Sequence, residues 1–446
     1  MKKNLIWGSL CLAAPLFFAA CDEVEEGNND PQKETPSNEP EGFCDTLKGW
    51  NIKQRQQIAV PLVLTGKEQE AINKSNAFAN QLISKLIKKD TNIVVSPISL
   101  EILFGMIMNG QNETALNETK DVLGLGDLSL ADINILMNKI STSLNSNLDS
   151  TSYFETQNAI WSNNILFKKK FVETVQNNYS ASIANLDFNQ EGASDTINNW
   201  CKEATRGMIN HLVSKEELKE LAAVMANACY FKAEWGGRFI GMTKDNFYDR
   251  NGNLVKDNAY MMCDAPTHLI KYEETDSYEL ARIPYGNGSF YMDVVLPKMD
   301  DEQFILNFDW TKVNPQKFKR MNDYGWPVSF ELYMPRFKAD NHHSLLKMME
   351  DLGMKNIKAT LSGMNDALYI SKLGQLANIA VDEEGTKASA VSYALLETVG
   401  EHITHTMYIN RPFYYAIREA KTGLILFAGY VVVPDDYVEP VEGKYY

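Results

Sequence analysis

The histidines of this chain stand at few spacings that could support catalysis or hold a metal ion. His402 and His405 lie three apart, but in an extended segment such side chains point to opposite faces. His342 and His343 are neighbours in a segment predicted to be a solvated loop. The chain also lacks Gly-x-Ser-x-Gly, His-Glu-x-x-His, a phosphate-binding glycine loop and a cysteine–histidine signature. We therefore predict no metal, no cofactor and no enzymatic activity.

The first twenty residues have the form of a secretory signal. Lys2 and Lys3 precede a mostly apolar run over residues 5–18, which is too short to span a bilayer comfortably. The run ends in Phe-Ala-Ala before Cys21, a pattern that resembles the bacterial lipobox, whose cysteine is diacylated and becomes the new N-terminus. We predict a lipoprotein signal peptide over 1–20 and a stable lipid anchor on Cys21. The alternative is an ordinary signal peptide followed by an incidental cysteine.

The segment after Cys21 is predicted to be a tether. Four acids follow the cysteine, Asp22, Glu23, Glu25 and Glu26, and the residues after them are mainly Asn, Pro, Ser and Glu. The segment therefore has too little apolar surface to bury for it to fold into an ordered structure. We assign residues 21–64 to the lipidated N-terminus and its flexible tether. The early acids resemble a surface-export signal of some Gram-negative lipoproteins. The predicted location is the bacterial cell envelope, lipid-anchored to the outer membrane and facing outward, with a periplasmic orientation as the alternative.

The net charge and the remaining cysteines exclude further classes of partner and site. The net charge is −15, and the signal removes two lysines and no acid, so the mature chain would repel nucleic-acid phosphates. We expect no nucleic-acid partner. Four cysteines lie outside the signal and the lipid site, and their spacings fit neither a metal site nor a disulfide framework. We predict buried or incidental thiols at Cys44, Cys201, Cys229 and Cys263.

Helix and strand patterns alternate from residue 65 to residue 434 without a Pro/Gly-rich linker. This arrangement predicts one domain of α+β class over 65–434, followed by a C-terminal tail over 435–446. Apolar residues recur at helical spacing over 72–86 and 133–140, and alternate as in a strand over 290–296 and 328–332. Long strands therefore mix with amphipathic helices.

The segment 386–409 has the pattern of a strand, although its length is that of a loop. It contains no proline and one glycine, Gly400. Alternate residues from Thr386 to Leu396 are small or apolar, while the intervening positions from Lys387 to Glu397 include the charges. The first set could therefore pack onto a core if the segment entered a sheet.

Several motifs resemble the serpin family of protease inhibitors, and they occur in the family's order. They cover about residues 65–434 and are found at Asn92–Leu100, Asn227–Lys232 with Trp235, Val381–Ala390, and Met407–Ile417, which continues to Phe427–Gly429. A single Asn-Arg-Pro-Phe motif would be weak evidence for the family, but the ordered set of motifs is specific to it. The resemblance implies the serpin fold, with three β-sheets, about nine helices and an exposed reactive-centre loop. It also implies a monomer.

The resemblance further implies a suicide-substrate mechanism. In this family a protease attacks the loop and forms an acyl-enzyme, and the freed loop inserts as a new strand before water completes the hydrolysis. The hinge that begins this movement matches Glu383, Glu384, Gly385, Thr386, Lys387, Ala388, Ser389 and Ala390. Small residues in this hinge favour an inhibitor. The alternative is a non-inhibitory serpin that acts as a binding or carrier protein.

The expected reactive bond follows from the family's hinge spacing. Counting sixteen residues from Glu383 gives Val399, followed by Gly400, with Thr398 or Glu397 as alternatives. A β-branched aliphatic residue suits the small apolar pocket of elastase-like serine proteases. No Lys or Arg lies between residues 387 and 411, which argues against trypsin-like targets. We therefore expect elastase-like serine proteases as partners, with cysteine proteases as a further class.

The family also implies two supporting sites beneath the loop. One is a hydrogen-bond network, called the shutter, that joins a serine, an asparagine and a histidine. Ser96 or Ser99 and Asn227 match the first two, but Gln375 stands at the histidine position. Glutamine can donate and accept as neutral histidine does, so the network could persist without its pH response. The second site, the breach, matches Trp235 beneath the point where the loop enters.

Overall fold

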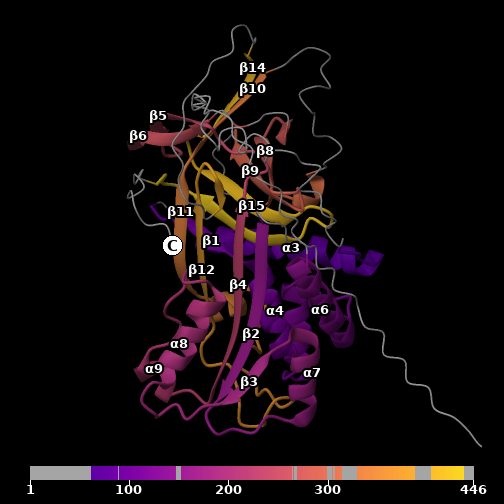
Figure 1. Cartoon of the computed structure of the whole chain (residues 1–446). Coiled ribbons are helices and arrows are strands. Elements are labelled where there is room, and N and C mark those ends of the chain that lie inside the picture. The colour runs from indigo at the N-terminus through magenta and orange to yellow at the C-terminus, as the bar shows by residue number, and fades with distance from the viewer. Residues whose placement is uncertain are drawn as a thin grey trace, which may run out of the picture. The chain divides into compact units, whose positions relative to one another are not determined.

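The computed structural model describes residues 62–88, 90–146, 152–263, 265, 269–298, 304, 307–313, 329–386 and 403–435. All of them belong to one compact unit, Trp50–Tyr446. These described residues form eight α-helices and three β-sheets (Figure 1), which confirms the predicted α+β class. The predicted signal peptide, the lipidated Cys21, nearly all of the tether and nearly all of the tail lie outside the described residues.

The central sheet carries the strands that surround the hinge. Its order is β11-β12-β13-β4-β2-β3. The strands span Ser152–Ser162 (β2), Ser182–Asn185 (β3), Ala223–Glu234 (β4), Phe337–Ser344 (β11), Gly374–Val381 (β12) and Gly385–Thr386 (β13). Burial alternates strictly along β11 and β12, because one face of each strand packs on the core and the other faces outward.

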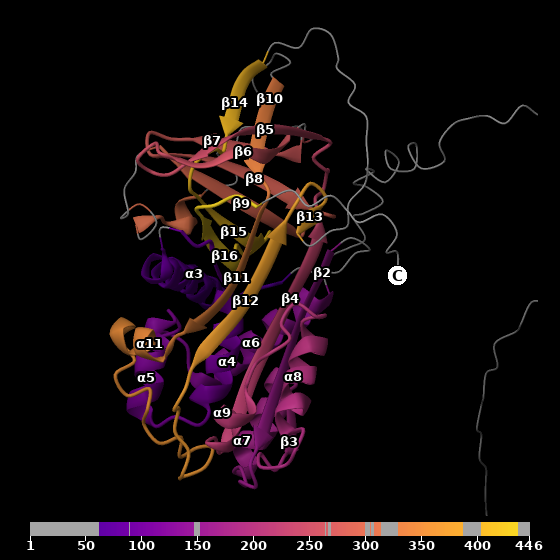
Figure 2. The same ribbon diagram turned by 90° about the vertical axis from the view of Figure 1, so that its left-hand side faces the viewer.

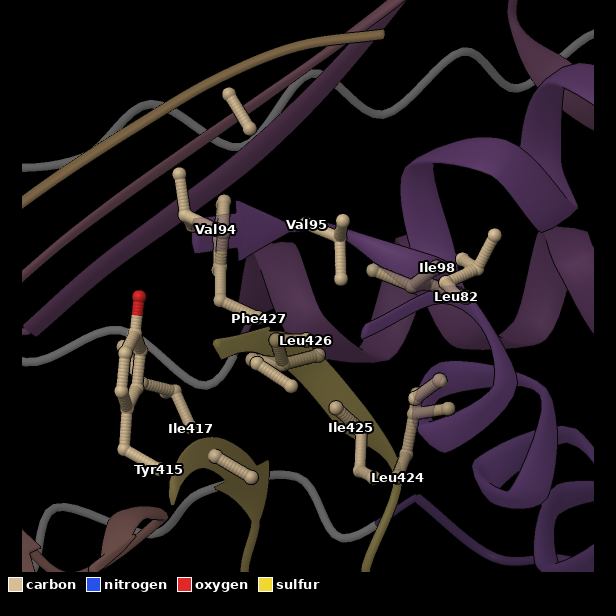
Figure 3. Packing of buried hydrophobic residues seen from close by; sticks show 14 of the residues in the cluster. Leu82, Val94, Val95, Ile98, Tyr415, Ile417, Leu424, Ile425, Leu426 and Phe427 are labelled. Atoms are coloured by element: carbon tan, nitrogen blue, oxygen red, sulfur yellow. The ribbon is translucent and has the colours of Figure 1, made fainter. Parts of the chain in front are cut away.

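The core sheet lies behind it and has the order β1-β16-β15-β9-β8-β7. Its strands span Ile93–Val95 (β1), Lys271–Glu274 (β7), Tyr278–Tyr285 (β8), Phe290–Pro297 (β9), Phe413–Glu419 (β15) and Ile425–Val431 (β16). Every residue of β1, β15 and β16 is buried, because helices cover these strands as well. Figure 3 shows Val94 and Val95 packed with Leu426, Phe427 and Tyr415.

The predicted strand over 290–296 is confirmed as β9, but its burial is not alternating. Asp293 stands at an apparently polar position and is fully buried. Arg282 donates two hydrogen bonds of 2.6 Å to the Asp293 carboxylate, and Arg418 donates a third at 3.1 Å. A buried charge requires such partners, so Asp293, Arg282 and Arg418 form an ion-pair cluster inside the protein rather than a solvent face.

The third, upper sheet has the order β14-β10-β6-β5. Its strands span Gly241–Tyr248 (β5), Leu254–Cys263 (β6), Ser329–Pro335 (β10) and Ile403–Tyr408 (β14). β14 pairs in parallel with β10, and both stand at the top of Figure 1. Because β13 ends at Thr386 and β14 begins at Ile403, the two described ends of the predicted reactive-centre loop belong to two different sheets.

The helices pack chiefly on the lower part of the molecule. They are α3 (Gly66–Leu86), α4 (Pro97–Met108), α5 (Glu113–Val122), α6 (Leu130–Ser146), α7 (Lys169–Tyr179), α8 (Ala193–Ala204), α9 (Lys215–Lys219) and α11 (Leu346–Leu352). The helical spacings over 72–86 and 133–140 fall in α3 and α6, as predicted. Thr65 and Glu68 form a capping box that starts α3, and Pro97 occupies the first turn of α4. No helix in the described part of the chain is long and apolar enough to cross a membrane.

Glu101 is a buried acid on α4 that makes no ion pair in the described structure. Ser75 on α3 donates a 2.6 Å hydrogen bond to its Oε1 atom, while Oε2 is enclosed without a hydrogen-bond partner. Burial disfavours the charged form more than the Ser75 bond favours it, and it raises the pKa of Glu101 to about 8. The carboxyl group is therefore neutral in the folded protein at slightly acidic pH.

We predict that Glu101→Gln flattens the stability of the protein against pH. The folded-state pKa lies above the ordinary value of 4.5. The contribution of the neutral carboxyl is therefore complete below about pH 4.5 and is lost as pH rises through about 8, by at most about 1.4 kcal/mol per pH unit. Thermal melting of both proteins at pH 5 and pH 8 checks this. The variant should melt near the wild-type temperature at pH 5 and clearly above it at pH 8; a pH-independent difference would contradict it.

Candidate functional site

An open slot runs between β4 and β12 of the central sheet. Among the described strands, these two neighbours share no direct ladder: they are joined only through β13, which occupies the upper end. Thr386 pairs with Val381 of β12 and with Ala233 of β4. Figure 2 shows β12 and β4 side by side, with β13 at their upper ends. The slot therefore already holds the first rung of an additional strand.

A tight turn leads from β12 into that rung. The Asp382 side chain accepts hydrogen bonds from the backbone N–H groups of Glu384 (3.0 Å) and Gly385 (3.3 Å). A Cβ atom on Gly385 would collide with the carbonyl oxygen of Ala233, so only glycine permits this approach to β4. The predicted hinge residues Glu383, Glu384, Gly385 and Thr386 form this turn and the short strand β13 that follows it. Lys387, Ala388, Ser389 and Ala390 lie outside the described residues.

Trp235, the residue assigned to the breach, contacts this turn directly. Its side chain is 1% exposed, and its ring nitrogen donates a 2.8 Å hydrogen bond to the carbonyl oxygen of Asp382. Its backbone N–H donates to the Glu384 carbonyl at 2.7 Å. The ring stacks on Tyr285 at a centroid distance of 4.5 Å and an interplanar angle of 9°. Trp235 therefore holds the turn by its backbone and its side chain together.

Two arginines, to which the sequence assigned no role, neutralise the acids of the hinge. Arg336 donates a short hydrogen bond to Glu383, and both side chains are largely buried. Arg238 lies 3.5 Å from Glu384 and also pairs with Glu234. Burial nevertheless raises the pKa of Glu384. Glu383 lies 47 positions from Arg336 in the chain, so only the folded structure reveals this pair.

Lower in the slot, the predicted shutter residues line one cavity of about 90 Å³. Its walls include Ser96 and Ser99 from the start of α4, Asn227 and Cys229 from β4, and Gln375 from β12. The segment that follows α8 closes the opposite side. The structure therefore brings the residues of the predicted network together around one cavity, below β13 in the slot.

The bonds within this cavity differ from the predicted network. Gln375 donates from Nε2 to the Ser96 carbonyl at 2.8 Å and accepts from the Ser96 N–H at 3.1 Å. Ser96 Oγ donates instead to the Leu426 carbonyl at 2.8 Å. Asn227 donates to Asn158 on β2, and among the described residues it makes no hydrogen bond with Gln375. Gln375 thus binds the backbone of the serine, and Asn227 belongs to the opposite wall.

The cysteines behave as the sequence predicted where the structure describes them. Cys201 and Cys263 are buried, and none of the three described cysteines forms a disulfide. The Cys229 side chain reaches the cavity, yet surrounding protein atoms raise the pKa of its thiol to about 12. This thiol is therefore protonated and unreactive at neutral pH. Cys44 lies outside the described residues.

The prediction that His342 and His343 lie in a loop is wrong, and the predicted exposure to solvent holds for His342 but not for His343. Both belong to β11, and His343 is only 9% exposed. His343 Nε2 lies 3.0 Å from the carbonyl oxygen of Val94, to which it can donate. A strand with one buried face is recognised in a sequence by alternating apolar residues, and two adjacent histidines do not show this alternation. The inward-facing residue of this strand, His343, instead makes a polar contact with the edge strand β1.

Asn341 and Gln375 continue the same arrangement along β1. Asn341 accepts from the Val94 N–H at 2.7 Å and donates to the Asn92 carbonyl at 3.1 Å. Together with His343, they satisfy successive backbone groups between residues 92 and 96. The β11–β12 wall of the slot is therefore fixed to the core sheet by side chains. The proposed reactive bond, Val399–Gly400, and the side chains of His402 and His405 lie outside what the structure describes.

Comparisons with known proteins agree with this architecture. The serpin family model, described as serine protease inhibitor, matches residues 73–434. Serpin-Z3 of Arabidopsis thaliana is 28% identical over 395 residues, which cover 82% of this chain and 99% of the relative. A serpin-like protein of Methanosarcina acetivorans is 27% identical over 384 residues, covering 81% of this chain and 87% of the relative.

A solved structure gives the same result. The thermophilic serpin tengpin in its native state superposes with a TM-score of 0.71 at 25% identity, covering 83% of this chain and 95% of tengpin. The three sheets, the hinge turn and the slot occur together in a chain whose family match extends over most of its length. The chain therefore belongs to the serpin family of serine protease inhibitors.

Proposed function

We propose that this protein is an inhibitory serpin that traps elastase-like serine proteases by insertion of its cleaved loop into the slot. The observation that carries the proposal is the position of β13. The first residue after the hinge turn already pairs with both walls, and below it the facing edges of β4 and β12 share no ladder in the described structure. Unpaired strand edges accept an added strand through backbone hydrogen bonds.

The register of β13 supports the alternation seen in the loop. Thr386 faces the core and is 3% exposed. Two steps further in the same register, Ala388 would stand between Ile379 of β12 and Phe231 of β4, which are both buried in the core. Lys387 would stand beside the exposed Lys232. The small residues would thus enter the core while the charged residue stays in solvent.

The chemistry proceeds through the protease's own mechanism. Its serine oxygen attacks the carbonyl carbon of Val399, the Val399–Gly400 amide bond breaks, and the new amine of Gly400 leaves. An ester then joins Val399 to the protease. If the loop inserts before water attacks this ester, the protease stays covalently attached and its active site is deformed. The inhibitor therefore acts as a substrate whose reaction stops at the acyl-enzyme.

We further propose that Cys21 carries lipid and tethers the domain to the outer membrane of a bacterial envelope, facing outward. The small residues before Cys21 and the acidic, apolar-poor segment after it support this arrangement. A tethered inhibitor would act on proteases that reach the cell surface.

The site of cleavage is the first test. Purified protein incubated with elastase should yield an adduct stable in hot detergent, together with a released C-terminal peptide that begins at Gly400. Mass spectrometry of that peptide identifies the bond. A cut three or more residues away would show that the assignment of Val399 is wrong, and adducts only with trypsin-like enzymes would exclude the proposed specificity.

The second test separates trapping from cleavage. Ala388→Arg places a charge on the face that enters the core, where an unpaired charge costs several kcal/mol, so insertion should stall while cleavage continues. This variant should be consumed as a substrate and form little adduct. The matched control is Ser389→Arg, which faces outward in the same register and should trap nearly as wild type does. Equal trapping by Ala388→Arg and wild type would favour a binding or carrier role instead.

The anchor is tested by Cys21→Ala. We expect the wild-type protein to sediment with membranes and to partition into detergent, because its lipid provides the attachment. The variant should lose this attachment and appear in the soluble fraction. A Cys21→Ala protein that remained wholly with the membranes would contradict the lipid assignment.

A further inference from the structure

The Tyr285 hydroxyl contacts Thr386, the loop residue that the described structure places between β4 and β12. Its oxygen lies 2.6 Å from Thr386 Oγ1, and the two side chains are 0% and 3% exposed. Tyr285 is the last residue of β8, so this hydrogen bond links the core sheet to the start of the inserted strand. Breaking it without replacement would leave two buried hydroxyl groups unsatisfied.

The surrounding structure holds the Tyr285 ring in place. One face stacks on Trp235, and Phe231 packs edge-on at a centroid distance of 5.3 Å. The backbone is fixed as well: Gly236 N–H donates to the Pro284 carbonyl at 2.7 Å, and Gly286 N–H donates to the Glu234 carbonyl at 2.9 Å. The hydroxyl is therefore presented to the hinge from a rigid position, so Thr386 loses little freedom by meeting it.

Thr386 occupies the rung from which a strand would extend. It pairs with Val381 on one side and Ala233 on the other. The first step of adding a strand to a sheet is unfavourable, because residues lose conformational entropy before many backbone hydrogen bonds have formed. Each later rung adds hydrogen bonds at a smaller entropic cost. A residue that keeps the first rung closed removes that initial cost.

We propose that Tyr285 is a positioning residue for loop insertion, because its hydroxyl holds Thr386 in the first rung before any protease has cut the loop. The inference rests on the inhibitory function proposed above and deepens it. Insertion competes with hydrolysis of the acyl-enzyme, so the rate of insertion decides whether a protease is trapped or released. Tyr285 acts on this competition without contacting the protease.

The test uses Tyr285→Phe, which retains the ring and its stacking on Trp235 but removes the hydroxyl. A buried hydrogen bond of ordinary strength shifts an equilibrium about five-fold. Without it, Thr386 should occupy the first rung less often, and insertion should slow by about the same factor. The number of inhibitor molecules that are cleaved without trapping a protease, counted per protease trapped, should therefore rise about five-fold. The rate at which inhibitor and protease associate should stay unchanged. Thr386→Val should have the same effect, and the double variant should be no worse than either single variant.

Tyr179→Phe is the matched control. Its hydroxyl also makes a buried 2.6 Å hydrogen bond, to Asn134 on α6, far from the hinge in the sequence and outside the central sheet. This variant should lose a similar amount of melting temperature and keep the wild-type stoichiometry. If Tyr285→Phe kept the wild-type stoichiometry, or if Tyr179→Phe raised it equally, the positioning role would be overturned.

A second readout separates this inference from the proposed function. Trace protease is used to cut the loop, and the rise in melting temperature is followed with time in wild type and Tyr285→Phe. If wild type is cut but traps nothing, inhibition is wrong, yet slower stabilisation of the variant still supports the role of Tyr285. If neither protein is stabilised after cutting, insertion does not occur and both conclusions fail. Equal rates of stabilisation would overturn the inference alone.

Discussion

The lack of a hydrogen-bonded ladder between β4 and β12 over the described residues is the constraint on which the rest of this structure depends. Peptide N–H and C=O groups at a sheet edge need partners, and a central position in a sheet would ordinarily supply them. Here only β13 bridges the two strands in the described part of the sheet. The fold therefore leaves room for one more strand, and the chain's own loop has the alternation to fill it.

The two walls of the slot are held in different ways. The β11–β12 wall is fixed to β1 and the start of α4 by hydrogen bonds from Asn341, His343 and Gln375. The β4 wall bonds to β2, and Asn227 pairs with Asn158 within the same half of the sheet. A strand that enters can therefore separate β4 from β12 without breaking the polar bonds of either wall. Burial lowers the pKa of His343, so the anchor is neutral near physiological pH.

Two kinds of sequence signal pointed to the site. The alternation of the loop at the period of a strand is a local pattern that can be read from its residues alone. The hinge and Trp235 came from the ordered family motifs, and the close approach of Gly385 to Ala233 is visible only in the folded structure. The helices over 72–86 and 133–140 could also be predicted from the sequence, because their apolar residues recur at helical spacing.

The remainder depends on contacts between residues far apart in the chain. Tyr285 meets Thr386 across 101 positions, and His343 meets Val94 across 249, so no spacing in the sequence marks either pair. Gln375 lies beside Ser96, and its partners there are backbone atoms rather than the serine hydroxyl. Asp293 reads as a polar residue on an exposed face and is instead neutralised in the core. Tertiary packing decided each of these positions.

Hydrogen–deuterium exchange along β4 and β12 tests the central claim most directly. Amide groups on the facing edges of the slot should exchange readily in the intact protein and become protected after the loop is cut, because the inserted strand then accepts their hydrogen bonds. Amide groups of β15 and β16 in the core sheet should stay protected in both states. If cutting the loop left exchange along β4 and β12 unchanged, the slot would not be the receptor for the loop, and the account would be contradicted.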